Sequence, residues 1–419
     1  MRNASMWWIM ILIVLLVDLY IFIAIRSSLF GYSTHRNRVL FASIYWLVTA
    51  FSLSVILIVP RLPASDTGQP GRTVLFTIVF ALFLAKILAA VFFLVDDLRR
   101  LAQWTAGKLF SANNEVSEVS GADSETISRS GFLTWLGIAA GGTLFSSLIY
   151  GFSNKYNYKI KRVALTFSNL PVAFKGFKMI QISDVHSGSF TNKAAVNRGI
   201  DMILKENADV ILFTGDLVNN MATEMKEYID SFSRLKAPMG VYSTLGNHDY
   251  GDYHSWSSAA EKNANLDHLK AIHGQMGWRL LLDEHLPLEK NGAQIGLIGV
   301  QNISGKARFH SYGNMAAAMK GTENYPFKIL MSHDPSHWDS EVNKKYPDVD
   351  LMLSGHTHGM QFGVEIPGFR WSPVQYVYKQ WAGLYEKGRQ KLYVNRGYGF
   401  IGYPGRVGIL PEITVFELT

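Results

Sequence analysis

Long apolar runs dominate the first 150 residues of the chain. Three of them are almost continuously apolar: Met6 to Ile25, Val39 to Val59 and Val74 to Val95. Each is about 20 residues long, the length of helix that crosses a bilayer. A weaker run, Phe132 to Tyr150, contains three glycines. The first run lacks the small-residue cleavage site that a signal peptide would carry before the next span. The pattern therefore predicts three transmembrane helices in residues 1–102 and a fourth in residues 131–152.

Two ionisable residues interrupt these runs, Asp18 in the first and Lys86 in the third. An unpaired charge at the centre of a membrane costs about 2.5–3.5 kcal/mol or more. The first and third helices would run parallel, and both residues lie at a similar depth in their spans. We therefore expect Asp18 and Lys86 to pair and to fix how the helices pack. A proton or ion pathway is the alternative, for which a single pair is weak support.

Residues 103–130 are predicted to connect the third and fourth helices. From Ser111 to Ser130 this segment is rich in Ser, Asn, Glu and Gly and has few apolar residues. Such a composition buries too little surface to order itself. The segment is therefore interpreted as a flexible linker.

The side of the membrane on which residues 153–419 lie is not decided by basic residues, because seven flank the predicted spans on each side. The motif Ser128-Arg129-Ser130-Gly131-Phe132-Leu133 resembles a twin-arginine export signal, with Ser130 in the place of the second arginine. This resemblance favours a multi-pass protein of the cytoplasmic (inner) membrane whose C-terminal region lies on the extracytoplasmic side.

After residue 153 the pattern changes to short apolar runs separated by polar segments. Tyr156 to Leu165 alternates as a strand does, and Thr191 to Asn207 has helical spacing. Asn291-Gly292 lies between two alternating runs and is a strong hairpin signal. Strands joined first by helices and later by hairpins predict an α/β domain of mixed sheets with outer helices, spanning residues 153–419.

Five apolar runs of this domain end in residue types that bind metals. The endings are Asp184-Val185-His186, Gly215-Asp216, Gly246-Asn247-His248-Asp249, His333 and Gly355-His356-Thr357-His358. Strand ends in layered α/β folds bring together side chains from distant parts of a chain. Eleven of the twelve histidines follow residue 150. The pattern therefore predicts a metal site at the ends of these strands.

The composition of the chain excludes several kinds of site and of partner. The chain has no cysteine, which excludes disulfides, thiolate metal ligands and a cysteine nucleophile. The net charge of +7 is spread over 419 residues without polybasic runs. We therefore expect no nucleic-acid partner.

The order of these endings resembles the calcineurin-like metallophosphoesterase superfamily. The segment Tyr393-Val394-Asn395-Arg396-Gly397, followed by Pro411-Glu412, is similar to its membrane-associated bacterial branch, whose members act on phosphodiesters or lipid-linked UDP-sugars. The resemblance implies a four-layer αββα sandwich, here preceded by an all-α bundle of four transmembrane helices.

The resemblance also implies roles for single residues. Asp184, His186 and His358 would hold one divalent ion, Asn247, His333 and His356 a second, and Asp216 would bridge them. Oxygen and nitrogen ligands without sulfur fit Mn, Fe or Zn. His248 would protonate the leaving oxygen or stabilise the charge that develops there, and Asp249 would orient the His248 ring.

The function predicted from this site is that of a membrane-anchored, dinuclear-metal phosphoesterase. It would hydrolyse a phosphodiester or pyrophosphate bond by attack of a metal-bound hydroxide. The membrane helices favour a lipid-linked substrate. The alternatives are a phosphodiesterase acting on soluble small phosphoesters and a non-catalytic membrane sensor or scaffold.

Other residues near the motifs leave alternatives open. Arg396 could contact a substrate anion or form a structural ion pair. Tyr250 to Gly277 is polar and aromatic and could be a substrate-facing insertion or a surface helix. Asn219 and Met360 depart from the usual residues of the superfamily beside the ligands, which affects substrate choice more than metal binding.

Overall fold

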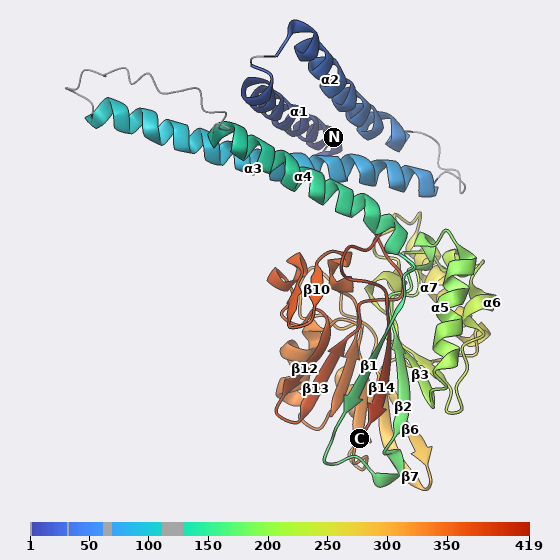
Figure 1. The fold of residues 1–419 in the computed structure, drawn as a ribbon. Coiled ribbons are helices and arrows are strands. Elements are labelled where there is room, and N and C mark those ends of the chain that lie inside the picture. Colours follow the sequence, from blue (N-terminus) through green and yellow to red (C-terminus); the bar gives the residue numbers. More distant parts are fainter. Residues whose placement is uncertain (1, 32, 62–68, 111–128) are drawn as a thin grey trace. The chain divides into compact units, whose positions relative to one another are not determined.

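The computed structural model describes the whole chain except residues 1, 32, 62–68 and 111–128. The chain divides into two units, Met1–Tyr150 and Gly151–Thr419. The first is helical, and the second contains all the strands among the described residues (Figure 1).

Four helices of the described residues are long and apolar enough to cross a membrane. They are α1 (Arg2–Leu29), α2 (His35–Ile58), α3 (Gln69–Phe110) and α4 (Arg129–Asn154). The four predicted apolar helices are confirmed as helices, each with the length and composition of a membrane span. Helix α4 begins in the first unit and ends in the second.

Helix α3 ends later than the apolar pattern indicated. Residues 103–110, predicted to be linker, are its last turns. The end of an apolar run shows where a helix leaves the apolar part of a membrane. The helix itself can continue beyond that point as long as its residues favour helix. The rest of the predicted linker, residues 111–128, lies outside the described residues.

The predicted ion pair inside the first unit is confirmed. Lys86 Nζ lies 2.5 Å from Asp18 Oδ1, and Asp18 is 1% exposed. Thr49 donates a hydrogen bond of 2.7 Å to the other carboxylate oxygen. The Asp18 carboxylate therefore joins α1, α2 and α3. Gly141 of α4 allows a further close approach, because a Cβ there would lie 2.6 Å from the carbonyl oxygen of Ala85 in α3.

The second unit contains two six-stranded sheets. The first has the order β1 (Lys159–Leu165), β14 (Glu412–Leu418), β2 (Phe177–Ile182), β3 (Val210–Phe213), β4 (Val241–Ser243) and β5 (Arg279–Leu280). Neighbours are parallel except β14 and β2. The carboxyl ends of β2, β3 and β4 therefore share one edge, opposite the end of β14.

The second sheet is parallel in its centre and antiparallel at both margins. Its order is β12 (Gly383–Lys387), β13 (Gln390–Val394), β9 (Leu351–Ser354), β8 (Lys328–Met331), β7 (Ala293–Gly299) and β6 (Glu284–Lys290). The predicted hairpin at Asn291-Gly292 joins β6 and β7, and both turn residues have positive φ. A separate two-stranded hairpin consists of β10 (Val364–Ile366) and β11 (Phe369–Trp371).

Successive residues of one strand belong to apolar clusters on opposite faces of the sheet. These clusters show the order of the layers. Met179 of β2 belongs to the apolar cluster between the sheets together with Ile329 of β8. Its neighbour Ile180 belongs to the cluster under α5, with Ile200. Met315 of α8 belongs to a third cluster, on the outer face of the second sheet. The predicted αββα sandwich is confirmed (Figure 1).

The outer layers are formed by short helices. Those over the first sheet are α5 (Lys193–Lys205), α6 (Ile229–Phe232) and α7 (Ala259–Gln275), and the second sheet carries α8 (Met315–Met319) and α9 (Asn343–Lys345).

Candidate metal centre

The seven predicted ligands all follow the carboxyl ends of strands. Asp184 and His186 follow β2, Asp216 follows β3, Asn247 follows β4, His333 follows β8, and His356 and His358 follow β9. Strands from both sheets therefore deliver side chains to one end of the sandwich, as parallel strands in layered folds do.

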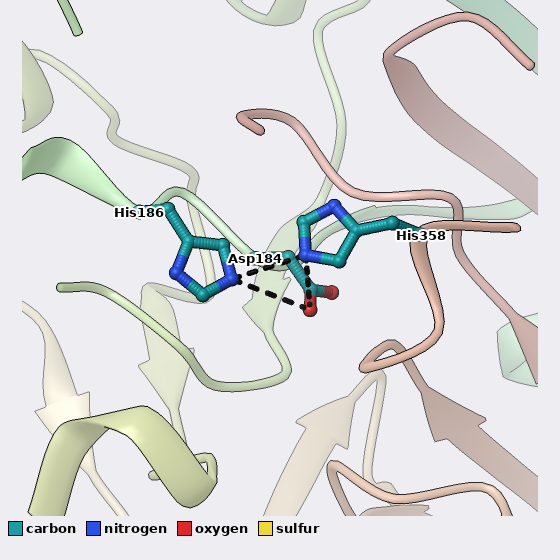
Figure 2. Close-up of side chains that lie close together, drawn as sticks. All are labelled: Asp184, His186 and His358. Atoms are coloured by element: carbon teal, nitrogen blue, oxygen red, sulfur yellow. Dashed lines mark hydrogen bonds and ion pairs between the residues drawn. The ribbon is translucent and has the colours of Figure 1, made fainter. Parts of the chain in front are cut away.

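One group of side chains consists of Asp184, His186 and His358, called here the Asp184 group. Its possible ligand atoms all lie within 4.8 Å of one another. Figure 2 shows both imidazole rings turned towards the carboxylate. His186 Nε2 lies 3.0 Å from His358 Nε2, which lies 3.2 Å from Asp184 Oδ1. All three residues are buried.

A second group consists of Asp216, His333 and His356, called here the Asp216 group, and it meets the same 4.8 Å limit. His333 Nε2 lies 3.1 Å from Asp216 Oδ2. Asn247 joins this group, because its Oδ1 lies 2.8 Å from His356 Nδ1.

Asp216 stands between the two groups. Its Oδ2 is 3.1 Å from His333 Nε2 in its own group and 3.5 Å from His186 Nε2 in the Asp184 group. The structure thus brings all seven predicted residues together, with one carboxylate in the shared position.

The chemistry of this cluster fits bound cations. Burial holds the pKa of His186 well below its usual value, which leaves the imidazole neutral with a lone pair for a metal. Burial alone would raise the pKa of Asp184, but His358 and His333 keep it below its usual value. His333 Nε2 is buried and faces Asp216 Oδ2 at 3.1 Å, outside hydrogen-bond geometry. Two buried carboxylates among imidazoles therefore present negative charge and unused donor atoms to a cation.

Burial alone would lower the pKa of His333, but the Asp216 carboxylate raises it to about 10. A proton on His333 thus supplies positive charge to the cluster. A cation beside Asp216 would supply that charge in the proton's place, since a metal ligand must give up its proton.

Backbone strain is concentrated in these loops. Five of the seven predicted ligands have positive φ, namely Asp184, His186, Asp216, His356 and His358. Each such residue costs about 1–3 kcal/mol and persists only where its surroundings fix it. Gly355 permits the close approach of two loops, because a Cβ there would lie 1.9 Å from Ser183 Oγ and 2.2 Å from Asp184 Oδ2.

His248 lies at the edge of the cluster, with its ring 4.9 Å from that of His186 and nearly perpendicular to it. Its backbone N–H donates to Asp216 Oδ1 at 2.9 Å. Its ring Nδ1 lies 2.7 Å from the carbonyl oxygen of Asn219. The side chain is partly exposed.

The expectation that Asp249 orients the His248 ring is wrong. The Asp249 carboxylate accepts backbone N–H groups of Asp216 at 2.9 Å, Leu217 at 2.8 Å and Gly246 at 2.8 Å. In the tight turn Asn247–Tyr250 the Asp249 carboxylate points back to the backbone at the start of the turn, as in a capping box. The carbonyl of Asn219 takes the orienting position instead.

Several residues beside the ligands were not singled out from the sequence. Tyr378 has its hydroxyl 2.8 Å from His356 Nε2, and the Asp334 carboxylate lies 3.8 Å from the same nitrogen. Arg406 is fully buried, with Nη2 3.2 Å from His358 Nδ1. Asp334 directly follows a ligand and could have been found on that ground, whereas the other two carry no local signal.

The structure also bears on the alternatives left open for Arg396 and for the segment 250–277. Arg396 is buried and forms ion pairs with Glu412 and, at 2.7 Å, with Glu365, which favours the structural interpretation. In the segment 250–277, Tyr253 receives a 2.9 Å hydrogen bond from Asn247 Nδ2 and so adjoins the site. The later part of that segment is the surface helix α7.

Comparison with known families agrees with this architecture. Residues 1–155 match the family described as "Probable Calcineurin-like phosphoesterase, transmembrane domain". Residues 177–360 match the family "Calcineurin-like phosphoesterase".

Curated relatives carry the same description. The "Transmembrane protein with metallophosphoesterase domain" of Danio rerio is 27% identical over 276 residues, 64% of this chain and 59% of that protein. The "Uncharacterized metallophosphoesterase YkuE" of Bacillus subtilis is 29% identical over 299 residues, 70% of this chain and 98% of its own length. The "Phosphodiesterase YaeI" of Escherichia coli is 28% identical over 247 residues, 58% of this chain and 82% of its own length. The match to the Danio rerio protein thus spans less than two thirds of that relative.

Two family matches that together run from the membrane helices through the metal cluster agree with the fold and with the candidate ligands. The chain is a membrane protein with four candidate spans. Residues 177–360 thus carry a calcineurin-like phosphoesterase domain, and residues 1–155 match the transmembrane domain described for such phosphoesterases.

Proposed function

We propose that this chain hydrolyses a phosphodiester or pyrophosphate bond with two divalent cations. The observation that carries the proposal is the position of the Asp216 carboxylate, 3.1 Å from His333 Nε2 and 3.5 Å from His186 Nε2. A shared carboxylate between two sets of nitrogen and oxygen donors is the arrangement that a two-metal hydrolase requires.

The ligand assignment follows the two groups. Asp184, His186 and His358 would hold one cation, and Asn247, His333 and His356 the other, with Asp216 shared. This donor set fits Mn, Fe or Zn. When bound, such cations would polarise the phosphoryl oxygens and lower the pKa of an attacking water.

His248 is the proposed general acid. Its Nδ1 lies 2.7 Å from the Asn219 carbonyl, an oxygen that can only accept, so Nδ1 carries a proton. In the imidazolium form Nε2 carries a second proton, and this is the proton we assign to the leaving oxygen. Asp249 is a positioning residue, since its carboxylate holds the backbone of Asp216 rather than a ring.

The proposed substrate is a lipid-linked phosphoester. The membrane helices of the same chain support this choice, because they keep the site close to membrane-borne molecules. A soluble phosphodiester is the rival, and the printed name of the Escherichia coli relative, a phosphodiesterase, fits both. A non-catalytic scaffold is the weaker alternative, because all seven candidate ligands are present and adjoining.

We place the catalytic unit on the extracytoplasmic side of the inner membrane, on the strength of the twin-arginine-like motif at Ser128–Leu133. The absence of cysteine gives a direct test. A Val172→Cys variant would be labelled by a membrane-impermeant maleimide in intact cells if the unit lies outside, and only after lysis if it lies inside.

The activity is tested with the full-length protein in detergent and bis-p-nitrophenyl phosphate. Chelator-treated protein should be inactive and should regain turnover with Mn²⁺, Fe²⁺ or Zn²⁺. Asp216→Asn should lose turnover and bind less metal, as measured by elemental analysis. Metal binding without turnover of soluble or lipid-borne esters would support the scaffold instead.

A further inference from the structure

The hairpin β10–β11 carries an apolar face that the site does not use. Val364 pairs with Trp371, and Ile366 pairs with Phe369. Paired residues and residues two apart lie on one face of a two-stranded ribbon. Val364, Ile366 and Phe369 are 42%, 58% and 54% exposed, which is unusual for large apolar side chains on one small element.

The opposite face of the hairpin is charged and bound to the domain. It carries the remaining pair, Glu365 and Arg370. Glu365 forms an ion pair of 2.7 Å with buried Arg396. The Arg370 guanidinium lies 5.0 Å above the Trp381 ring. The hairpin is therefore fixed by its polar side, and its apolar side faces outwards.

The apolar surface continues beyond the hairpin. Met360, Tyr376 and Val377 are 57%, 78% and 46% exposed. Within residues 359–378 the charged residues are Glu365 and Arg370, and both belong to the inward face. The turn of the hairpin, Pro367-Gly368, is also uncharged. This surface is called here the apolar hairpin surface.

The apolar hairpin surface begins close to the end of a membrane span. The candidate span in α4 ends at Asn154. In the second unit, the carbonyl of Gly151 in its last turn accepts the N–H of Arg406 at 2.9 Å. The next residue, Val407, accepts the N–H of Gly363 at 2.9 Å, and β10 starts one residue later. One short segment of chain thus contacts both the end of the span and the base of the hairpin.

We infer that the apolar hairpin surface inserts into the interfacial region of the phospholipid bilayer. Exposed aliphatic and aromatic side chains on an uncharged turn are the composition that partitions to that region. Within the second unit, the last turn of the span in α4 and the base of the hairpin are joined by hydrogen bonds through residues 406 and 407, which supports a bilayer next to the hairpin. The inference stands on the second unit's own contacts and is independent of the proposed reaction.

The same geometry gives the surface a role near the site. Val364 is six positions after His358, and in Figure 1 β10 lies at the end of the unit opposite the C-terminus. That is also the end at which the ligands follow β2, because β2 is antiparallel to β14. A bilayer contact at the hairpin would hold the candidate metal centre beside membrane-borne phosphoesters.

The experiment uses the full-length protein, which has no native cysteine, in vesicles of phosphatidylcholine and phosphatidylglycerol. A nitroxide is attached to Ile366→Cys, to Phe369→Cys and, as a control, to Val172→Cys. Val172 is 80% exposed and equally apolar, but it precedes the amino end of β2, at the opposite end of the sandwich. Collisions of each nitroxide with oxygen, which partitions into lipid, and with a water-soluble nickel chelate are measured.

We expect the ratio of oxygen to nickel collisions to be several-fold higher at positions 366 and 369 than at position 172. Equal ratios at the three positions would overturn the inference, because the hairpin would then lie in water. Low accessibility to both reagents at 366, or spin–spin broadening between labelled copies, would also overturn it, because a protein surface would then cover the hairpin.

Discussion

The carboxylate of Asp249 accepts the backbone N–H of Asp216 at 2.9 Å. The residue between the two ligand groups is thus held by the loop that carries Asn247 and His248. Asp249→Asn replaces one acceptor oxygen by a donor that faces other N–H groups. We expect the variant to lose about 1–3 kcal/mol of stability and to bind metal more weakly. Turnover per bound metal should change much less.

The matched control for that variant is Asp350→Asn. Asp350 is equally buried, and its Oδ2 accepts the backbone N–H of Lys328 at 2.8 Å, at the start of β8 rather than at its end. We expect it to lower the melting temperature without changing metal content. Equal metal content in both variants would contradict the positioning role of Asp249.

His248→Ala should separate chemistry from metal binding. The ring lies beside the cluster but takes no place in either ligand group. Loss of a general acid slows an enzyme by about 100- to 10,000-fold. We therefore expect a fall of this size in kcat with unchanged metal content. His268→Ala, on the exposed face of α7, is the control and should be fully active.

The ligands could be predicted because each follows an apolar run, so sequence alone places them at strand ends. The layers followed from the same runs and from the resemblance. Tyr378 and Arg406 could not be found in this way. They contact His356 and His358 across 22 and 48 positions of chain, and such contacts depend on how the loops and strands between them fold.

The failed expectation for Asp249 has a local cause. The motif predicts which residues lie close together, but it does not predict the turn geometry that sets the direction of each side chain. In the turn Asn247–Tyr250 the carboxylate reaches the N–H of Gly246 at 2.8 Å, three residues back, so it points away from the His248 ring. The sequence did contain a signal for this turn geometry, namely an acidic residue three positions after a glycine at a helical turn.

The pair Asp18–Lys86 should be tested by a double-variant cycle. Lys86→Ala leaves a carboxylate buried at 1% exposure without its cation, which costs about 3–5 kcal/mol for a buried pair. We expect lower yield of monodisperse protein in detergent and a lower melting temperature. Asp18→Ala with Lys86→Ala should recover most of the loss. A double variant as unstable as Lys86→Ala would show that the pair does not fix helix packing.

Acid stability should depend on His273, a fully buried residue of α7 that is not among the candidate ligands. Burial lowers its pKa from 6.5 to about 3. The unfolded chain therefore takes up a proton below pH 6.5 that the folded chain refuses until about pH 3. Its contribution to stability is complete above pH 6.5 and falls by about 1.4 kcal/mol per pH unit below it.

Unfolding of the wild type and of His273→Leu should be compared from pH 7 to pH 4. The variant should lose less stability over that interval, because it removes the group that the unfolded chain protonates. His268→Leu, which changes an exposed histidine of the same helix, should follow the wild type. Parallel pH profiles for wild type and His273→Leu would contradict the assignment.

The apolar hairpin surface should matter for membrane-borne substrates and not for soluble ones. Ile366→Glu with Phe369→Glu places two charges on exposed side chains that contact none of the candidate ligands, so folding and metal content should be unchanged. Inserting those charges into a bilayer is unfavourable, and the hairpin would leave it. We expect turnover of bis-p-nitrophenyl phosphate to be kept and turnover of a phosphodiester lipid in vesicles to fall. Val172→Glu, at the opposite end of the sandwich, should leave both unchanged, and an equal loss on both substrates would instead indicate damage to the metal centre.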